Sequence, residues 1–97
     1  MDDKAEENTA RGAFEIVNRL GLHARAAAKL VRLAGRFHSK VEVAKDGQHA
    51  DAKSVMGVLL LCGVPGATLE VSARGQDAQA AVDAIGELIQ DRFGEDS

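Results

Sequence analysis

The way the hydrophobic pattern changes along the chain predicts an α+β sandwich with the element order β-α-β-β-α-β-α. Four short segments alternate apolar and polar residues, as strands do, and three segments carry apolar residues at helical spacing. The 97 residues suffice for one hydrophobic core and not for two. Four short strands and three helices fit a four-stranded antiparallel sheet, covered on one face by the helices and wet on the other.

The first half of the chain contributes a strand, a helix and a second strand. Residues 14–18 alternate in polarity and indicate the first strand. Over residues 24–37 the apolar side chains recur at i, i+3, i+4 and i+7, which predicts a helix with Gly35 near its end. Residues 41–43 place valines on both sides of a glutamate and predict the second strand.

Turn and cap signals set the elements of the second half. Asp46-Gly47 predicts a hairpin, because both residue types accept the left-handed angles of a tight turn, and a third strand follows through Asp51. Ser54 stands before the apolar run VMGVLLL as the N-cap of a helix. Residues 69–73 alternate as a fourth strand, and 77–92 form the last helix.

The two ends of the chain differ in composition from the segment between them. Residues 1–12 are acidic with almost nothing to bury, so we expect a disordered leader there, with a partner-binding acidic arm as the alternative. Residues 94–97 are expected to be a frayed tail. Residues 13–93 then form the folded domain.

Composition excludes several classes of protein. A net charge of −3 and only three aromatic residues argue against a protein that coats nucleic acid. The single cysteine, Cys62, permits no internal disulfide and is expected to be buried at the end of an apolar helix. No apolar run is long enough to cross a bilayer, and no apolar signal segment follows the first charges. We expect a cytoplasmic monomer that binds no membrane.

The histidines do not form a metal motif. His23, His38 and His49 are separated by 15 and 11 residues, which matches no compact ligand spacing, so neither a metal nor another cofactor is expected. His38 and His49 are expected on the surface at strand edges.

His23 directly precedes the predicted helix at residue 24. Backbone N–H groups at a helix start have no partner inside the helix, and the positive end of the helix dipole favours an anion there. The same dipole disfavours imidazolium, which leaves His23 neutral and nucleophilic. Arg25 can add a charge-assisted fork to the same anion. These groups suit a transient phosphohistidine, although a histidine that merely caps or packs would occupy the same position.

The run Gly21-Leu22-His23-Ala24-Arg25 resembles the active-site signature of the HPr family. These proteins are the histidine-containing phosphocarriers of the bacterial phosphoenolpyruvate-dependent sugar phosphotransferase system. The block Lys53-Ser54-Val55-Met56-Gly57-Val58 is similar to the regulatory serine motif of the family. The element order also matches the open-faced β-sandwich of the family, and the resemblance extends over residues 14–93.

The resemblance implies a role for each matching residue. His23 would accept phosphate on Nδ1 from phosphorylated enzyme I and pass it to enzyme IIA-type or regulatory acceptors. Arg25 would stabilise the phosphoryl group, and the amides of Ala24 and Arg25 would bind its oxygens. Ser54 would be a phosphorylation site for a kinase/phosphorylase of the family, beside its capping role. The family usually has proline where this chain has Ala26, which predicts a slightly less rigid site.

Charge patterning supports docking onto proteins. Six basic residues and no acidic residue occur from Arg19 to Lys40, and helical spacing places several of them on one face. Lys29 and Arg32 are the docking candidates on this face, and the resemblance adds Met56. A solvated helix face is the simpler interpretation, and the basic set is too small to favour nucleic acid.

We therefore expect a phosphocarrier that is a reactant passed between enzymes and is not itself an enzyme. Two alternatives remain open at this point. One is a carrier of the nitrogen-related branch, whose phosphorylation state signals. The other is a corepressor-like binding module that uses Ser54 and lacks phosphotransfer.

Overall fold

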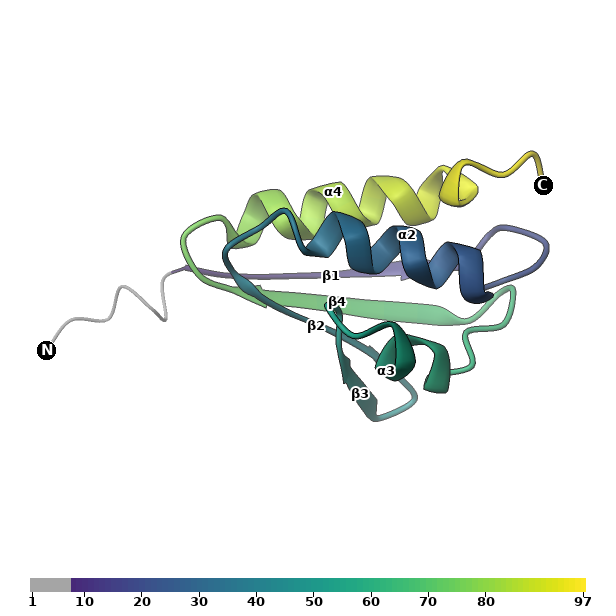
Figure 1. Cartoon of the computed structure of the whole chain (residues 1–97), viewed down its shortest axis with the longest axis horizontal. Helices are drawn as coiled ribbons and strands as arrows, with labels where there is room; N and C mark the ends of the chain where they lie inside the picture. The colour runs from purple at the N-terminus through teal and green to yellow at the C-terminus, as the bar shows by residue number, and fades with distance from the viewer. Residues whose placement is uncertain (1–7) are drawn as a thin grey trace, which may run out of the picture.

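The computed structural model describes residues 8–97, and its centre is a four-stranded sheet in the order β1-β4-β2-β3 (Figure 1). Every neighbouring pair in this sheet is antiparallel. The predicted α+β class and the antiparallel sheet are therefore confirmed. The strands are β1 (Thr9–Glu15), β2 (Lys40–Lys45), β3 (Gln48–Asp51) and β4 (Thr68–Arg74).

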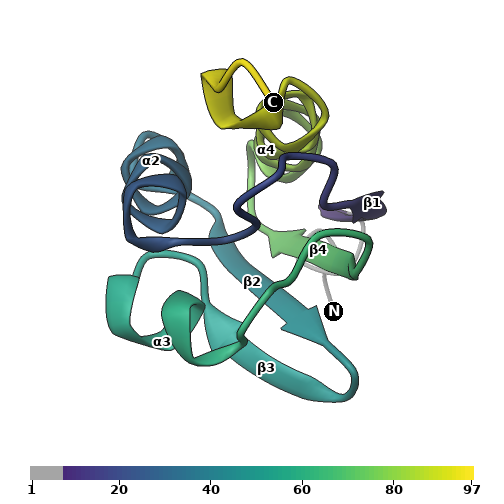
Figure 2. The same cartoon turned by 90° about the vertical axis from the view of Figure 1, so that its right-hand side faces the viewer.

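The three α-helices of residues 8–97 lie on the same side of the sheet, and the opposite face is uncovered (Figure 2). Contacts of α4 with β1 and β4, and of α3 with β3, hold the helical layer on the sheet. Ser54 is the N-cap of the second helix, as predicted. The helices are α2 (Ala24–Ala34), α3 (Val55–Leu60) and α4 (Ala78–Gln90), and a 3₁₀ turn η1 (Arg92–Gly94) follows α4.

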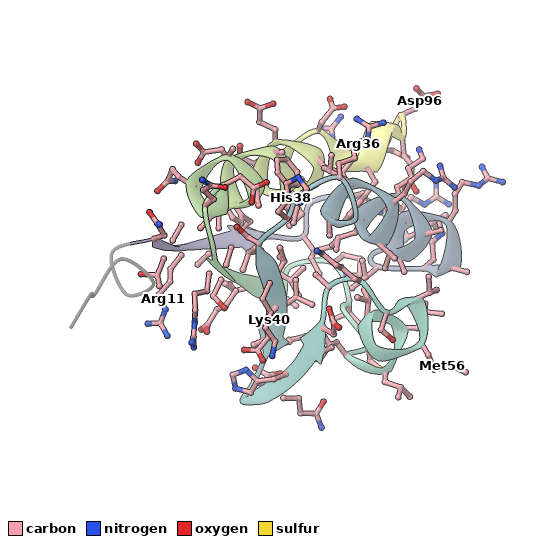
Figure 3. The ribbon with its side chains drawn as sticks, turned by 60° about the vertical axis from the view of Figure 1, so that its left-hand side comes forward. Arg11, Arg36, His38, Lys40, Met56 and Asp96 are labelled. Carbon is pink, nitrogen blue, oxygen red and sulfur yellow. The ribbon has the colours of Figure 1, made fainter. Side chains whose placement is uncertain are left out.

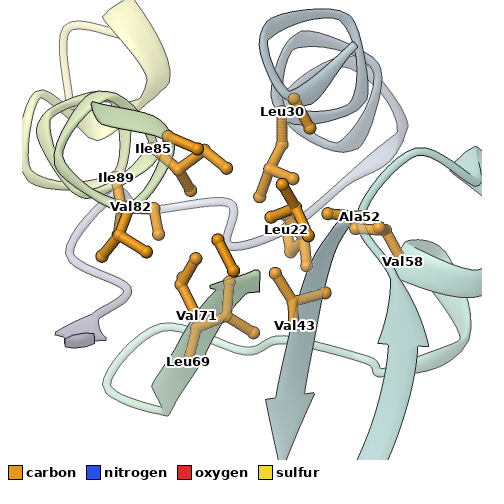
Figure 4. Packing of buried hydrophobic residues seen from close by; sticks show 14 of the residues in the cluster. Leu22, Leu30, Val43, Ala52, Val58, Leu69, Val71, Val82, Ile85 and Ile89 are labelled. Atoms are coloured by element: carbon orange, nitrogen blue, oxygen red, sulfur yellow. The ribbon is translucent and has the colours of Figure 1, made fainter. Parts of the chain in front are cut away.

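Small aliphatic side chains fill the space between the helices and the sheet, as the scarcity of aromatics predicts (Figure 4). Alternation along β4 directs Leu69 and Val71 into this layer and leaves Glu70 on the uncovered face. Phe93 is the exception, since it is the one fully buried aromatic ring among residues 8–97. The other large buried side chains are Ile16, Leu30, Val41, Val43, Val58, Val82, Ile85 and Ile89.

The hairpin between β2 and β3 is confirmed at the predicted residues. Asp46 and Gly47 have φ values of 52° and 82°. Positive φ at both central residues is the conformation whose twist matches two paired strands.

The expected boundaries at the two ends were wrong. Residues 1–7 of the expected leader lie outside the described residues, but Thr9 to Gly12 belong to β1, where Thr9 is paired with Arg74. Pairing with β4 orders this stretch although its side chains alone bury little. The strand ends at Glu15 and does not reach Asn18. The 94–97 tail is also not frayed at Glu95, whose carboxylate is hydrogen-bonded.

Two further expectations about single residues were wrong. Cys62 is exposed and has a φ of 52°, because α3 ends at Leu60 and the chain turns away from the core. His38 is exposed in the connection between α2 and β2 and not at a strand edge. His49 does lie exposed on the edge strand β3, where its Nδ1 is 3.1 Å from Glu42 Oε1.

A junction at the far end of the molecule ties α4 to the segment before β2. The carboxylate of Asp77, at the N-cap position of α4, accepts hydrogen bonds from the amides of His38 (2.8 Å) and Ser39 (2.9 Å) and from the Ser39 hydroxyl. Gly75, with a φ of 144°, allows this approach, because a Cβ there would lie 2.8 Å from Ser39 Cα. The bonds, led by that of the Ser39 hydroxyl, lower the pKa of Asp77 to about 2.

Asp77→Asn should therefore lower the thermal unfolding temperature at neutral pH, since an amide cannot accept hydrogen bonds on both of its polar atoms. A carboxylate with a depressed pKa stabilises the fold above its unfolded pKa and loses that effect as the pH falls through its folded pKa. The difference between the variant and the unchanged protein should thus shrink below about pH 4 and vanish near pH 2. Asp83→Asn, on the exposed side of α4, is the matched control. A difference that persisted at pH 2 would contradict the assignment.

Candidate functional site

The position of His23 is set by a close contact between two loops. Gly21 has a φ of 69°, and a Cβ at this residue would lie 2.5 Å from the carbonyl oxygen of Gly63. The amide of Leu22 donates to the same oxygen (2.7 Å). Glycine is required at position 21 on both grounds, backbone conformation and space. With this contact in place, His23 lies at the N-cap position of α2, with a φ of −77° and a ψ of 179°.

The hydrogen bonds of the His23 ring identify its tautomer. Nδ1 accepts from the backbone N–H of Arg25 at 3.2 Å, so this nitrogen carries a lone pair and no proton. Nε2 faces the carboxylate of Glu95 and is therefore the protonated nitrogen. The His23 side chain keeps 27% of its surface exposed, so a reagent can reach the ring.

Glu95 is held in place by Asn18. The Asn18 side-chain amide donates to Glu95 Oε1 (2.9 Å) and to the carbonyl of Gly21 (2.8 Å). The hydrogen bonds from Asn18 and His23 lower the pKa of Glu95, and the nearby Lys29 ammonium adds to this effect. Glu95 is thus a carboxylate at neutral pH. It orients the imidazole in the way that carboxylates orient catalytic histidines in other sites.

The turn η1 brings Glu95 back to the start of α2. Arg92 and Phe93 both have positive φ values, 58° and 54°, and reverse the chain after α4. Burial of the Phe93 ring anchors the reversal, and Lys29 Nζ donates to the Phe93 carbonyl (2.7 Å). The chain end therefore packs beside His23.

Arg25 and the first amides of α2 border the same site. Side chains from the loop before α2 and from the C-terminal residues line an open depression around His23 and Arg25. Ala24 and Arg25 are the first residues of α2, whose first turn contains no acidic residue. Ala26 is fully buried in that turn, so its methyl group packs in the core. The expected gathering of His23, Arg25 and the amides of residues 24 and 25 at one helix start is what the structure shows. The depression is lined by Arg19, Leu20, His23, Arg25, Glu95, Asp96 and Ser97.

The docking candidates differ in how available they are. Arg32 is exposed on α2, and Met56 is 72% exposed on α3, which packs against α2. Leu60, on the same short helix, is 71% exposed. Lys29 is partly buried, and its ammonium is already bound to the Phe93 carbonyl, so it fixes the chain end.

Ser54 is confirmed as the N-cap of α3. Its Oγ accepts from the amide of Gly57 at 3.1 Å, and its backbone is extended, with a φ of −117° and a ψ of 112°. The side chain is partly exposed. Capping of α3 is therefore one role of this hydroxyl.

Asn18 and Glu95 belong to this site, although no pattern in the sequence indicates a functional role for either residue. Asn18 is fully buried after β1, and its Oδ1 has no hydrogen-bond partner among residues 8–97.

Over residues 8–97 the structure contains no cluster of three or more His, Cys, Asp or Glu side chains suited to a metal. Nor does this part of the chain hold a helix that is long and apolar enough to span a membrane.

Comparison with known proteins extends over almost the whole folded region. The family model described as "PTS HPr component phosphorylation site" matches residues 10–91. Phosphocarrier protein HPr of Cupriavidus necator is 51% identical over 80 residues, which cover 82% of this chain and 90% of that protein. Phosphocarrier protein NPr of Shewanella violacea is 45% identical over 82 residues, covering 84% and 90% respectively.

A solved structure supports the same assignment. The crystal structure of HPr-C-His from Thermoanaerobacter tengcongensis superimposes with a TM-score of 0.87 at 40% sequence identity, and covers 91% of this chain and 99% of that one. The matches in sequence and in fold agree, and the chain belongs to the HPr family of phosphocarrier proteins of the phosphotransferase system.

Proposed function

We propose that the chain carries a phosphoryl group on Nδ1 of His23, taking it from phosphorylated enzyme I and delivering it to an enzyme IIA-type or regulatory acceptor. The observation that carries this proposal is that the two ring nitrogens of His23 have different hydrogen-bond partners. Nδ1 bears the lone pair at the start of α2, and Nε2 keeps its proton against Glu95.

The transfer step follows from this tautomer. The Nδ1 lone pair attacks phosphorus, the N–P bond forms, and the bond from phosphorus to the donor breaks with its electrons returning to the donor. The imidazole gains positive charge as the bond forms, and the Glu95 carboxylate stabilises that charge without a proton transfer. The amide of Arg25, released from Nδ1, and the amide of Ala24 then meet the phosphoryl oxygens. The Arg25 guanidinium adds a charge-assisted fork.

Docking uses the surface that surrounds His23. Arg25 and Arg32 supply positive charge on α2, and Met56 and Leu60 supply exposed apolar surface on the adjacent α3. An apolar patch with a charged border suits a brief, electrostatically steered encounter with an acidic partner. We expect the monomer to be the active form.

A second candidate function is that of a carrier in the nitrogen-related branch. The 45% sequence identity to an NPr protein supports this second candidate. Transfer rates with enzyme I of each branch, measured at equal concentrations, would separate the two functions. The enzyme I that gives the higher transfer rate identifies the branch in which the chain acts.

His23→Ala should abolish acceptance of phosphate from phosphoenolpyruvate and enzyme I while leaving the fold intact, because the ring lies partly exposed in an open depression and outside the hydrophobic core. Acid-labile, alkali-stable phosphate on the protein is the measurement, and circular dichroism checks the fold. Normal phosphate incorporation into His23→Ala would show that another residue is the carrier.

Arg25→Ala should retain the phosphate-accepting nitrogen but slow the transfer, and Arg25→Lys should restore only part of the rate.

Glu95→Gln should slow phosphate acceptance about 10- to 100-fold, since the neutral amide no longer stabilises the positive imidazole. Asp96→Asn changes the same net charge at the neighbouring residue and is the matched control. Nitrogen NMR of the His23 ring should report a mixture of tautomers in Glu95→Gln and the Nε2-protonated form in Asp96→Asn. Equal rates in the two variants would contradict the role given to Glu95.

Ser54→Ala should lower the stability by about 0.5–2 kcal/mol through loss of the cap, and should keep phosphate transfer to His23. Ser54→Asp should keep or slightly raise the unfolding temperature, because aspartate caps well and its charge suits a helix start. It should slow transfer from enzyme I through repulsion of an acidic docking surface. Transfer to Ser54→Asp at the unaltered rate would leave Ser54 with its capping role and without a regulatory one, whether or not a kinase/phosphorylase exists.

A further inference from the structure

Glu95 faces the nitrogen of His23 that does not react. Nε2 donates to the Glu95 carboxylate, whereas the phosphoryl group is assigned to Nδ1, which faces the amide of Arg25. The buried amide of Asn18 (2.9 Å) and the chain reversal at the fully buried Phe93 hold this carboxylate in place. These contacts do not involve Nδ1, so they persist when a phosphoryl group occupies that nitrogen. The family model ends at residue 91 and does not include Glu95.

The proton on Nε2 decides how easily a phosphoryl group leaves Nδ1. With this proton in place, the phosphorylated ring is an imidazolium, and breaking the N–P bond releases a neutral imidazole. Without it, the same step would have to release an imidazolate anion, which is a much poorer leaving group. The acid lability and alkali stability of phosphohistidine follow from this difference. Rapid donation of the phosphoryl group therefore requires that Nε2 stay protonated.

The charges around the ring favour that proton through one carboxylate. Among residues 8–97, Glu95 is the one carboxylate that forms an ion pair with the His23 ring. An opposite charge within about 4–6 Å favours the charged form of a titratable group. Asp96 also lines the depression, but its side chain points outward from the chain end (Figure 3). The nearby arginines oppose a charged ring, and a phosphoryl group bound by Arg25 offsets them. The charged side chains around the ring and its carboxylate are Arg19, Arg25, Lys29, Glu95 and Asp96.

We propose that Glu95 keeps the proton on Nε2 of His23 through the whole cycle of phosphate acceptance and donation. The inference rests on the proposed function, because it takes His23 as the carrier. In the donation step the nucleophile of the acceptor attacks phosphorus, the N–P bond breaks, and its electron pair returns to Nδ1. The proton on Nε2 does not move, so the ring returns to the tautomer of the unphosphorylated protein. Glu95 is thus a positioning residue for donation as well as for acceptance.

Phosphorus-31 NMR of the phosphorylated protein tests the inference. The unchanged protein and its variants are loaded with phosphoenolpyruvate and enzyme I, and the chemical shift of the phosphohistidine signal is followed against pH. The midpoint of this titration should fall by about one pH unit in Glu95→Gln. It should stay nearly unchanged in Asp96→Asn, which removes the same charge from the neighbouring residue. Glu95→Asp keeps the charge and should recover part of the shift.

A second measurement separates loss of the proton from a loosened site. At mildly alkaline pH, Glu95→Gln should lose its phosphate to water severalfold more slowly than the unchanged protein, because fewer of its phosphorylated rings are protonated. Return of the phosphate to unphosphorylated enzyme I breaks the same N–P bond and should slow by a similar factor. A loosened site would instead expose the phosphate and speed its loss to water.

The outcomes distinguish this inference from the proposed function. Equal titration midpoints in Glu95→Gln and Asp96→Asn, or faster loss of phosphate to water from Glu95→Gln, would overturn the inference and leave His23 as the carrier. The absence of any phosphohistidine signal from the unchanged protein after loading would overturn both.

Discussion

The buried side-chain amide of Asn18 joins the two ends of the fold at the site. One of its N–H groups holds the Gly21 carbonyl in the loop before α2, and the other holds the Glu95 carboxylate after α4. A buried amide with good partners is rigid, because breaking either bond leaves a polar atom unpaired away from water. The direction in which α2 starts, the orientation of the imidazole and the course of the chain end therefore depend on one another.

Most of the elements could be predicted from local patterns. The helical period before Ala34, the Asp46-Gly47 turn and the Ser54 cap each act over a few residues, and the structure has them where the sequence places them. The start of β1 could not be found in this way. Thr9 to Gly12 are ordered by register with β4, about sixty residues away, and their composition is that of a loop.

The same distinction applies to the site. His23 and Arg25 could be predicted because a helix start and its charges are local features of the sequence. Asn18 and Glu95 are 77 residues apart, and nothing in the composition near Glu95 indicates an ordered carboxylate. Glu95 is held beside His23 by two contacts that exist only in the folded chain. These are the burial of the Phe93 ring and the hydrogen bond from Lys29 to the Phe93 carbonyl. Cys62 shows the reverse case, in which an apolar run continues past the end of its helix.

The reversal at Arg92 and Phe93 has a practical consequence. Because Asp96 and Ser97 line the depression around His23, whatever follows Ser97 leaves the molecule beside the imidazole. An affinity tag or fusion partner attached at that end would stand between the histidine and an approaching protein. The other described end, at Asn8, lies beside Gly75 at the start of β1, away from the start of α2 where His23 lies (Figure 1). The choice of terminus for labelling thus decides whether the tagged molecule can be compared with the untagged one.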